Sequence, residues 1–222
     1  MRHAIVLLVI LAAAPAWAGP PAEAPASSAD SDHDIADLPR DRLGVGVFFQ
    51  DVTALTPGTG GFIAPVEGAV IGVAGTYQHR LSLDTGWFLD LGGGYGTGKQ
   101  TTEVFQPFAF RDVTSFALTF ARGGLGYEVR LTRRATAHAG GGLFYSRARA
   151  TFENGASTTH GERFTTIGLD ESIGVRLELE GNLGLGGEQY AAYGWGSGRG
   201  SDAKYSAAVK TSGYRAGLIV SF

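Results

Sequence analysis

The chain has 222 residues, about the size of one domain, and a formal net charge of −3 at pH 7. This weakly acidic balance disfavours a nucleic-acid partner, because nucleic-acid binding requires a basic face. The sequence contains no Cys, which excludes disulfide bonds, thiolate metal ligands and a Cys nucleophile.

Residues 1–18 have the pattern of a secretory signal peptide. A short basic start at 1–3 precedes an apolar run at 4–14, which is too short to span a bilayer as a helix. The small-x-small sequence Ala-Trp-Ala at 16–18 is a cleavage site for signal peptidase. We therefore expect export across the inner membrane and a mature chain that begins at Gly19.

Residues 19–40 are rich in Pro, Ala, Ser and Asp and contain too little apolar surface to fold. We interpret them as a disordered periplasmic tether. Within it, Asp30, Asp32, His33 and Asp34 form either a loose divalent-cation site or a solvated acidic linker. The linker is the favoured interpretation, because nothing around these residues fixes a ligand geometry.

From residue 43 onward, apolar and polar residues alternate with a period of two, which predicts β-strands. Eight strands are predicted, near residues 43–50, 69–81, 87–96, 114–131, 135–147, 165–179, 183–195 and 205–222. In the fourth predicted strand, Phe116, Leu118 and Phe120 lie on the opposite face from the apolar residues that follow. Either a bulge lies near residues 122–123 or these side chains point inward.

The connections between the predicted strands alternate in length. Short connections lie at 82–86, 132–134 and 180–182, and long ones near 51–68, 97–113, 148–164 and 196–204. Short periplasmic turns alternating with longer external loops are typical of membrane β-barrels. The pattern therefore places both termini in the periplasm.

The chain ends on an apolar strand face that consists of Tyr214, Ala216, Leu218, Val220 and Phe222. This end resembles the closing strand of a bacterial outer-membrane β-barrel. The resemblance implies that Tyr214, Leu218, Val220 and Phe222 form the signal read by the barrel-assembly machinery. The alternative is an ordinary amphipathic last strand of a soluble β protein, such as a periplasmic lipocalin-like barrel.

Residues 43–222 as a whole resemble the small eight-stranded outer-membrane barrels, which include the OmpA transmembrane domain and the OmpX/Ail adhesins. We therefore expect an all-β fold at 41–222, an antiparallel up-and-down transmembrane barrel in the bacterial outer membrane. The expected surroundings are outer-membrane lipid and lipopolysaccharide, and the external loops are expected to carry any further ligand.

Aromatic residues concentrate at the ends of the predicted strands. Two girdles at the membrane surfaces explain this distribution better than the general preference of aromatic residues for strands. The predicted girdle residues are Tyr77, Trp87, Tyr95, Tyr127, Tyr145, Tyr193, Trp195 and Tyr205.

The predicted inward faces collect charged residues of both signs. They are Arg80, Asp90, Glu128, Arg130, His138, Asp170, Arg176, Glu178, Glu188 and Arg215. The interior of an eight-stranded barrel is about wide enough for side chains to fill it, and buried charges must be paired. A closed network of salt bridges is the favoured interpretation, and a path for protons or small solutes is the alternative.

A barrel enzyme acting on lipid would need a nucleophile, a base and an orienting acid within mutual reach. Ser146 lies roughly 26 Å along the strand from His138 at the usual strand rise, so these two cannot pair. Asp170 and Ser172 approach His138 only in a favourable register. We therefore predict no catalytic residue, no cofactor, no metal ligand and no enzymatic activity.

Cations are scattered through the predicted external segments, where they either pair with lipopolysaccharide phosphates or are solvated. They are Lys99, Arg111, Arg147, Arg149, Arg163, Arg199 and Lys204. The sequence thus predicts a structural or adhesin-like surface-interaction barrel with a plugged polar lumen. A narrow channel is the alternative, and a lipid-modifying barrel enzyme is a more distant one.

Overall fold

The computed structural model describes residues 38–57, 63–82, 84–106, 108–154, 157–199 and 204–222. The predicted signal peptide, most of the predicted tether and the acidic cluster at 30–34 lie outside these residues and stay predictions. Within the described residues, no helix has the length and apolar character needed to cross a membrane.

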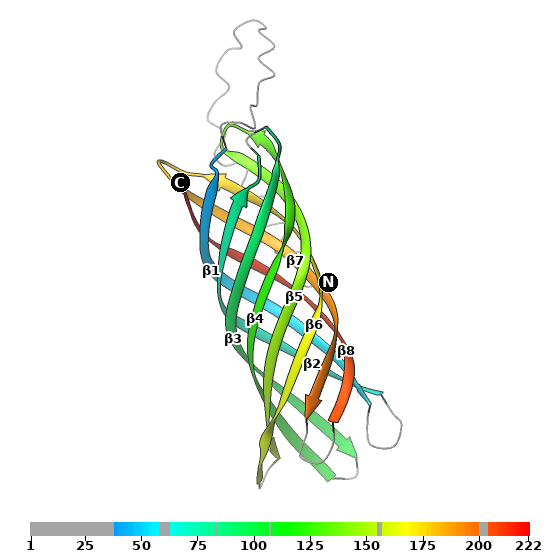
Figure 1. Ribbon diagram of the computed structural model, residues 1–222. Coiled ribbons are helices and arrows are strands. Elements are labelled where there is room, and N and C mark those ends of the chain that lie inside the picture. The colour runs from blue at the N-terminus through cyan, green and yellow to red at the C-terminus, as the bar shows by residue number, and fades with distance from the viewer. Residues whose placement is uncertain (1–37, 58–62, 83, 107, 155–156, 200–203) are drawn as a thin grey trace, which may run out of the picture. The chain divides into compact units, whose positions relative to one another are not determined.

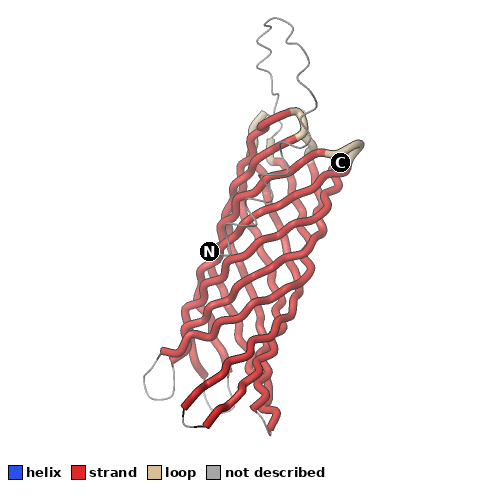
Figure 2. Tube along the Cα trace, turned by 180° about the vertical axis from the view of Figure 1, so that it is seen from behind, coloured by secondary structure: helices blue, strands red, loops and turns tan. Residues whose placement is uncertain are grey.

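The described chain is an antiparallel β-barrel of eight strands, as predicted (Figure 1). The strands are β1 (Asp41–Pro57), β2 (Ile63–Arg80), β3 (Trp87–Gln106), β4 (Phe108–Thr132), β5 (Ala135–Asn154), β6 (Ser157–Glu178), β7 (Leu183–Arg199) and β8 (Lys204–Ser221). Each strand pairs with its neighbours in chain order, and β8 pairs with β1 to close the barrel (Figure 2). Closure pairs the strands on both edges in the wall of the barrel, as β-structure in a lipid bilayer requires, whereas the β3–β4 ladder continues beyond Thr97 without β2.

The strands are longer than predicted at the end of the barrel opposite Asp41 and Phe222. The ladder between β3 and β4 continues to the pair Gln106 and Phe108, and the ladder between β5 and β6 continues to Asn154 and Ser157. The predicted strand ends at 96 and 147 were therefore wrong. An alternation of apolar and polar residues reveals a strand in the sequence only where one face of the strand is apolar and the other polar. The backbone hydrogen bonds between strands continue beyond the point where the two faces differ.

The fourth strand contains no bulge near residues 122–123, because its pairing with β5 is continuous there. The register shift lies instead between Arg130 and Thr132, beside the turn to β5. Leu118 and Phe120 are buried in the lumen, so the inward alternative is the right one for them. The side chain of Phe116 lies outside the described part of the chain.

The outward face of the barrel is a continuous band of exposed apolar side chains. Leu43, Ile71, Leu143, Ile167 and Leu169 are each at least half exposed, and they lie on four different strands. A soluble protein rarely exposes so much contiguous apolar surface, whereas a membrane barrel places such a band against lipid.

The end with the short turns is closed by backbone hydrogen bonds. Asp41 and Phe222 exchange two of them, with N···O distances of 3.1 and 3.0 Å, so the two ends of the barrel sequence meet. Gly181, in the turn between β6 and β7, has a φ of 67°, a conformation that favours glycine. This end is the one that the alternation of connection lengths assigns to the periplasm.

Candidate functional site in the barrel lumen

The lumen contains charged side chains from seven strands and His138 from β5. Of the predicted inward set, Arg80, Asp90, Glu128, His138, Asp170, Arg176 and Arg215 are buried, and Glu188 is largely so. Arg130 and Glu178 are partly exposed at the short-turn end, where Arg130 donates to the carbonyl oxygens of Thr132 and Arg133.

A first cluster surrounds Glu128 on β4, a carboxylate with no solvent exposure. Its Oε2 atom accepts hydrogen bonds from Nη1 of Arg42 at 2.8 Å and from Nη1 of Arg176 at 2.7 Å. Nε of Arg80 lies 3.9 Å from Oε1. Arginines from β1, β2 and β6 therefore converge on one acid, and charge-assisted bonds of this kind are among the stronger contacts in proteins.

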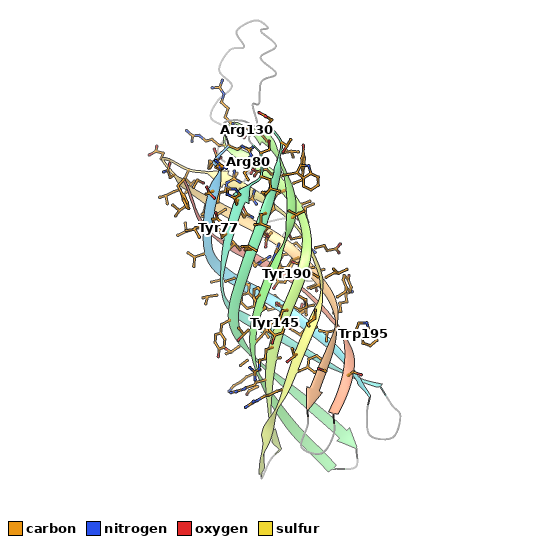
Figure 3. The ribbon with its side chains drawn as sticks, in the orientation of Figure 1. Tyr77, Arg80, Arg130, Tyr145, Tyr190 and Trp195 are labelled. Atoms are coloured by element: carbon orange, nitrogen blue, oxygen red, sulfur yellow. The ribbon has the colours of Figure 1, made fainter. Side chains whose placement is uncertain are left out.

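Arg80 also closes the barrel end near the short turns, where Figure 3 shows it beside Arg130. Its Nη1 donates to the carbonyl oxygen of Leu38 at 3.0 Å, and its backbone N–H donates to Arg40 at 2.8 Å. Leu38 is only 3% exposed. The last residues of the segment predicted as a tether therefore pack against the barrel mouth.

A second cluster surrounds the guanidinium of Arg122 on β4. It contacts Asp90, lies 3.1 Å from Oδ2 of Asp170 through Nε, and lies 3.4 Å from Oε1 of Glu188 through Nη1. Glu188 is shared, because Arg215 also contacts it and Nε2 of His138 lies 3.4 Å from its Oε2. This cluster joins side chains from β3, β4, β5, β6, β7 and β8.

An apolar layer follows the second cluster toward the other end of the lumen. The rings of Phe48 and Phe120 meet edge to face with centroids 5.2 Å apart. They pack with other buried side chains, namely Val70, Ala74, Leu118, Phe144 and Ala192. The hydroxyl of Tyr190 donates to Oε1 of Gln50 at 2.8 Å between this layer and the charges.

A cavity of about 70 Å³ borders both charged clusters. Arg42 and Arg176 line it from the first cluster, and His138, Glu188 and Arg215 line it from the second. Such a volume has room for a few water molecules, and the wall is mostly apolar apart from these side chains.

Two central arginines, Arg42 and Arg122, are missing from the predicted network. Arg42 precedes the predicted start of the first strand. Arg122 lies at the position where the sequence pattern was consistent with either a bulge or a change of the inward face. Charge balance could have signalled at most one of them, because the predicted set contained four arginines and five acids.

The residues considered for catalysis do not form a catalytic set. Asp170 and Ser172 both contact Arg122, whereas His138 contacts Glu188. Ser146 is buried opposite Thr166 on β6. Among the described residues, no group of three or more His, Cys, Asp or Glu side chains is arranged to hold a metal ion.

The predicted girdle residues lie at two levels of the outward face. Trp87 and Tyr127 pack edge to face with centroids 5.3 Å apart, and the hydroxyl of Tyr77 donates to Asp41 at 2.6 Å. At the other level, Tyr95, Tyr145, Tyr193 and Trp195 are exposed, and Figure 3 shows Tyr145 and Trp195 far from Tyr77. The side chain of Tyr205 lies outside the described part of the chain.

The proposed assembly signal lies on the outward face of β8. Leu218, Val220 and Phe222 are exposed, and Tyr214 is partly exposed opposite Phe49 of β1. The terminal aromatic side chain is accessible at the seam where the barrel closes.

No protein-family model matches this sequence, and no curated protein matches it. Among solved structures, the outer membrane protein OprG from Pseudomonas aeruginosa has a TM-score of 0.58 at 12% identity, over 85% of this chain and 99% of that chain. Neisserial surface protein A has a TM-score of 0.48 at 18% identity, over 81% and 97%. Ail, the attachment invasion locus protein of Yersinia pestis, has a TM-score of 0.40 at 11% identity, over 81% and 99%. At these identities the similarity shows the fold.

The first cluster yields a test of the lumen network. Glu128→Gln should lower the free energy of unfolding by about 3–5 kcal/mol, because it leaves buried arginines without their counter-charge. Glu178→Gln, at the partly exposed strand end, is the matched control and should cost less than about 1 kcal/mol. Urea titrations in phospholipid vesicles measure both values. Equal, small losses would contradict a network centred on Glu128.

Proposed function

We propose that this chain, which has the fold of the small eight-stranded outer-membrane barrels, is a surface-interaction barrel of the bacterial outer membrane with a closed lumen. The main support for the proposal is that side chains fill the lumen at several successive levels along the barrel. Because nothing passes through such a barrel, its function falls to its outer surface and to the end that projects from the membrane.

Two kinds of barrier support a closed lumen. The arginine clusters around Glu128 and Arg122 occupy the cross-section with paired charges. The apolar layer around Phe48 and Phe120 then removes the polar surface that a hydrated ion needs, and hydrophobic constrictions of this kind exclude water.

The long strands support a surface role. Beyond the girdle residue Tyr95, the β3–β4 ladder continues to Gln106, which is roughly 35 Å of strand at the usual rise. The β5–β6 ladder likewise continues beyond Tyr145 to Asn154. These paired hairpins extend well past the apolar band and offer a rigid surface outside the membrane.

A row of cations supports contact with the outer leaflet. The register pairs Arg149 with Arg163, Arg163 with Arg199, and Arg199 with Lys204, on four adjacent strands. Arg149 and Arg163 are exposed. Like charges directly opposite each other are destabilising, so this row favours an anionic neighbour.

The level of this row matches the headgroup region. Arg149 follows the girdle residue Tyr145 by four residues on β5, which is roughly 9 Å along the membrane normal for a strand tilted by about 45°. Lipopolysaccharide carries phosphates there, and guanidinium groups bind phosphate in two-point contacts. We propose lipopolysaccharide as the leaflet partner of this row.

A narrow channel is the second candidate, and the cavity of about 70 Å³ between the charged clusters is the observation that favours it. Five buried arginines surround four acids in the lumen, so a channel of this kind would prefer anions. Planar-bilayer recording separates the two candidates.

The refolded wild type is expected to show no steady conductance in planar bilayers. A variant with Phe120→Ala and Arg122→Ala, which removes adjacent side chains of the apolar layer and the second cluster, should raise the current, and heat-modifiable gel migration checks that it is folded. Steady anion-selective steps in the wild type would instead establish the channel.

The leaflet contact has its own test. Lipopolysaccharide in phosphatidylcholine vesicles should raise the unfolding temperature of the wild type but not of the Arg149→Gln/Arg163→Gln variant. The control variant Arg133→Gln/Arg134→Gln changes two exposed cations at the opposite end and should keep the full response. Loss of the response in both variants, or in neither, would contradict the proposed site.

A further inference from the structure

The outward face contains two polar side chains where the apolar band should be unbroken. On β6, Glu171 is exposed between Ile167 and Leu169 on one side and Ile173 and Val175 on the other. These four neighbours alternate with inward residues and face lipid, so Glu171 lies within the membrane-facing band.

Gln189 on β7 interrupts the same band. It is exposed, and the next outward positions beyond it include Leu185 toward the periplasmic end and Tyr193 toward the external girdle. Glu171 pairs with Ala191 in the ladder, and Gln189 pairs with Ile173, so the two polar residues are diagonal neighbours on one face. They form a patch that we name the Glu171–Gln189 patch.

The barrel does not satisfy this patch itself. Among the described residues, none makes a hydrogen bond or an ion pair with the side chain of Glu171 or Gln189. Ionisable and amide groups are costly in hydrocarbon, and those that occur there generally have a partner. Lipid tails have no group that could hydrogen-bond to Glu171 or Gln189.

Small residues surround the patch. In the ladders, Glu171 lies opposite Gly141 of β5 and Ala191 of β7, and Gly187 is the next outward position beside Gln189. The space at Gly187 is open, since a Cβ atom there would meet nothing closer than 3.9 Å. Small residues let two backbones approach closely, and they are enriched where membrane-embedded segments associate.

The chemistry of the patch is self-complementary. A carboxylate only accepts hydrogen bonds, whereas a carboxamide group supplies two N–H donors. About a two-fold axis through the patch, Glu171 of one copy meets Gln189 of the other, and the reverse pair forms at the same time. We propose that β6 and β7 form an intramembrane interface with a second copy of this chain.

Cross-linking tests this interface directly, because the chain has no Cys of its own. Ala191→Cys places a thiol beside the patch, and Gly75→Cys places one on an exposed outward position of β2, across the barrel. In phosphatidylcholine vesicles at low protein density, oxidation should give a dimer of the Ala191→Cys variant. The Gly75→Cys variant should stay monomeric.

The patch itself is tested by Glu171→Leu/Gln189→Leu in the Ala191→Cys background. These changes make the band uniformly apolar, so the variant should fold, as heat-modifiable gel migration will show. The dimer yield should fall by at least about tenfold, a loss of about 1.4 kcal/mol of association. A dimer that forms equally without the patch, equal cross-linking at residue 75, or a wild type that is monomeric in single-molecule photobleaching would overturn the proposal.

Discussion

Glu128 has no contact with solvent, and the barrel depends on how its charge is compensated. The compensating arginines come from β1, β2 and β6, so the contact spans the lumen rather than one pair of neighbouring strands. A one-residue slip of any strand moves all its inward side chains to the lipid face. Such a slip would place a guanidinium in hydrocarbon and leave its acid unpaired inside. The lumen charges therefore favour one register of the strands.

Glycine makes the dense filling of this small lumen possible. A Cβ atom at Gly96 would lie 2.7 Å from the ring of Phe48, and one at Gly94 would lie 2.7 Å from the ring of Phe120. The rings of Phe48 and Phe120 thus each lie against a position that has no side chain. Large side chains therefore alternate with glycines across the lumen, as expected for the interior of a small barrel.

The sequence was sufficient for the strand count, the closed up-and-down order and the face of most residues, because a period of two is a local property. It was insufficient where the contrast between faces disappears. Phe120 and Phe144 face an apolar part of the lumen, so the alternation on β4 became ambiguous and Arg122 beside it was missed. The outer strand ends were misplaced for the related reason that apolar and polar residues do not alternate regularly there. Pairings such as Arg122 with Asp170 depend on the register of several strands together, which no single strand encodes.

The three surfaces of the barrel thus differ in chemistry. The lumen contains ion pairs across the barrel, and the lipid face leaves one carboxylate and one amide without a partner among the described residues. On the external rim, the row of Arg149, Arg163, Arg199 and Lys204 has no acid opposite it in the register of the described strands. The second and third surfaces are the ones that can contact partners outside the barrel. This division is the physical basis for assigning the function to the outside of the barrel.

The most direct test of a lumen held together by cross-barrel ion pairs is a double-mutant cycle on Arg122 and Asp170, whose charged atoms lie 3.1 Å apart. Arg122→Gln, Asp170→Asn and the double variant are compared by urea unfolding in vesicles. A coupling free energy of about 1–3 kcal/mol is expected for two buried, directly paired groups. Effects that add to within about 0.3 kcal/mol would contradict a network that stabilises the barrel.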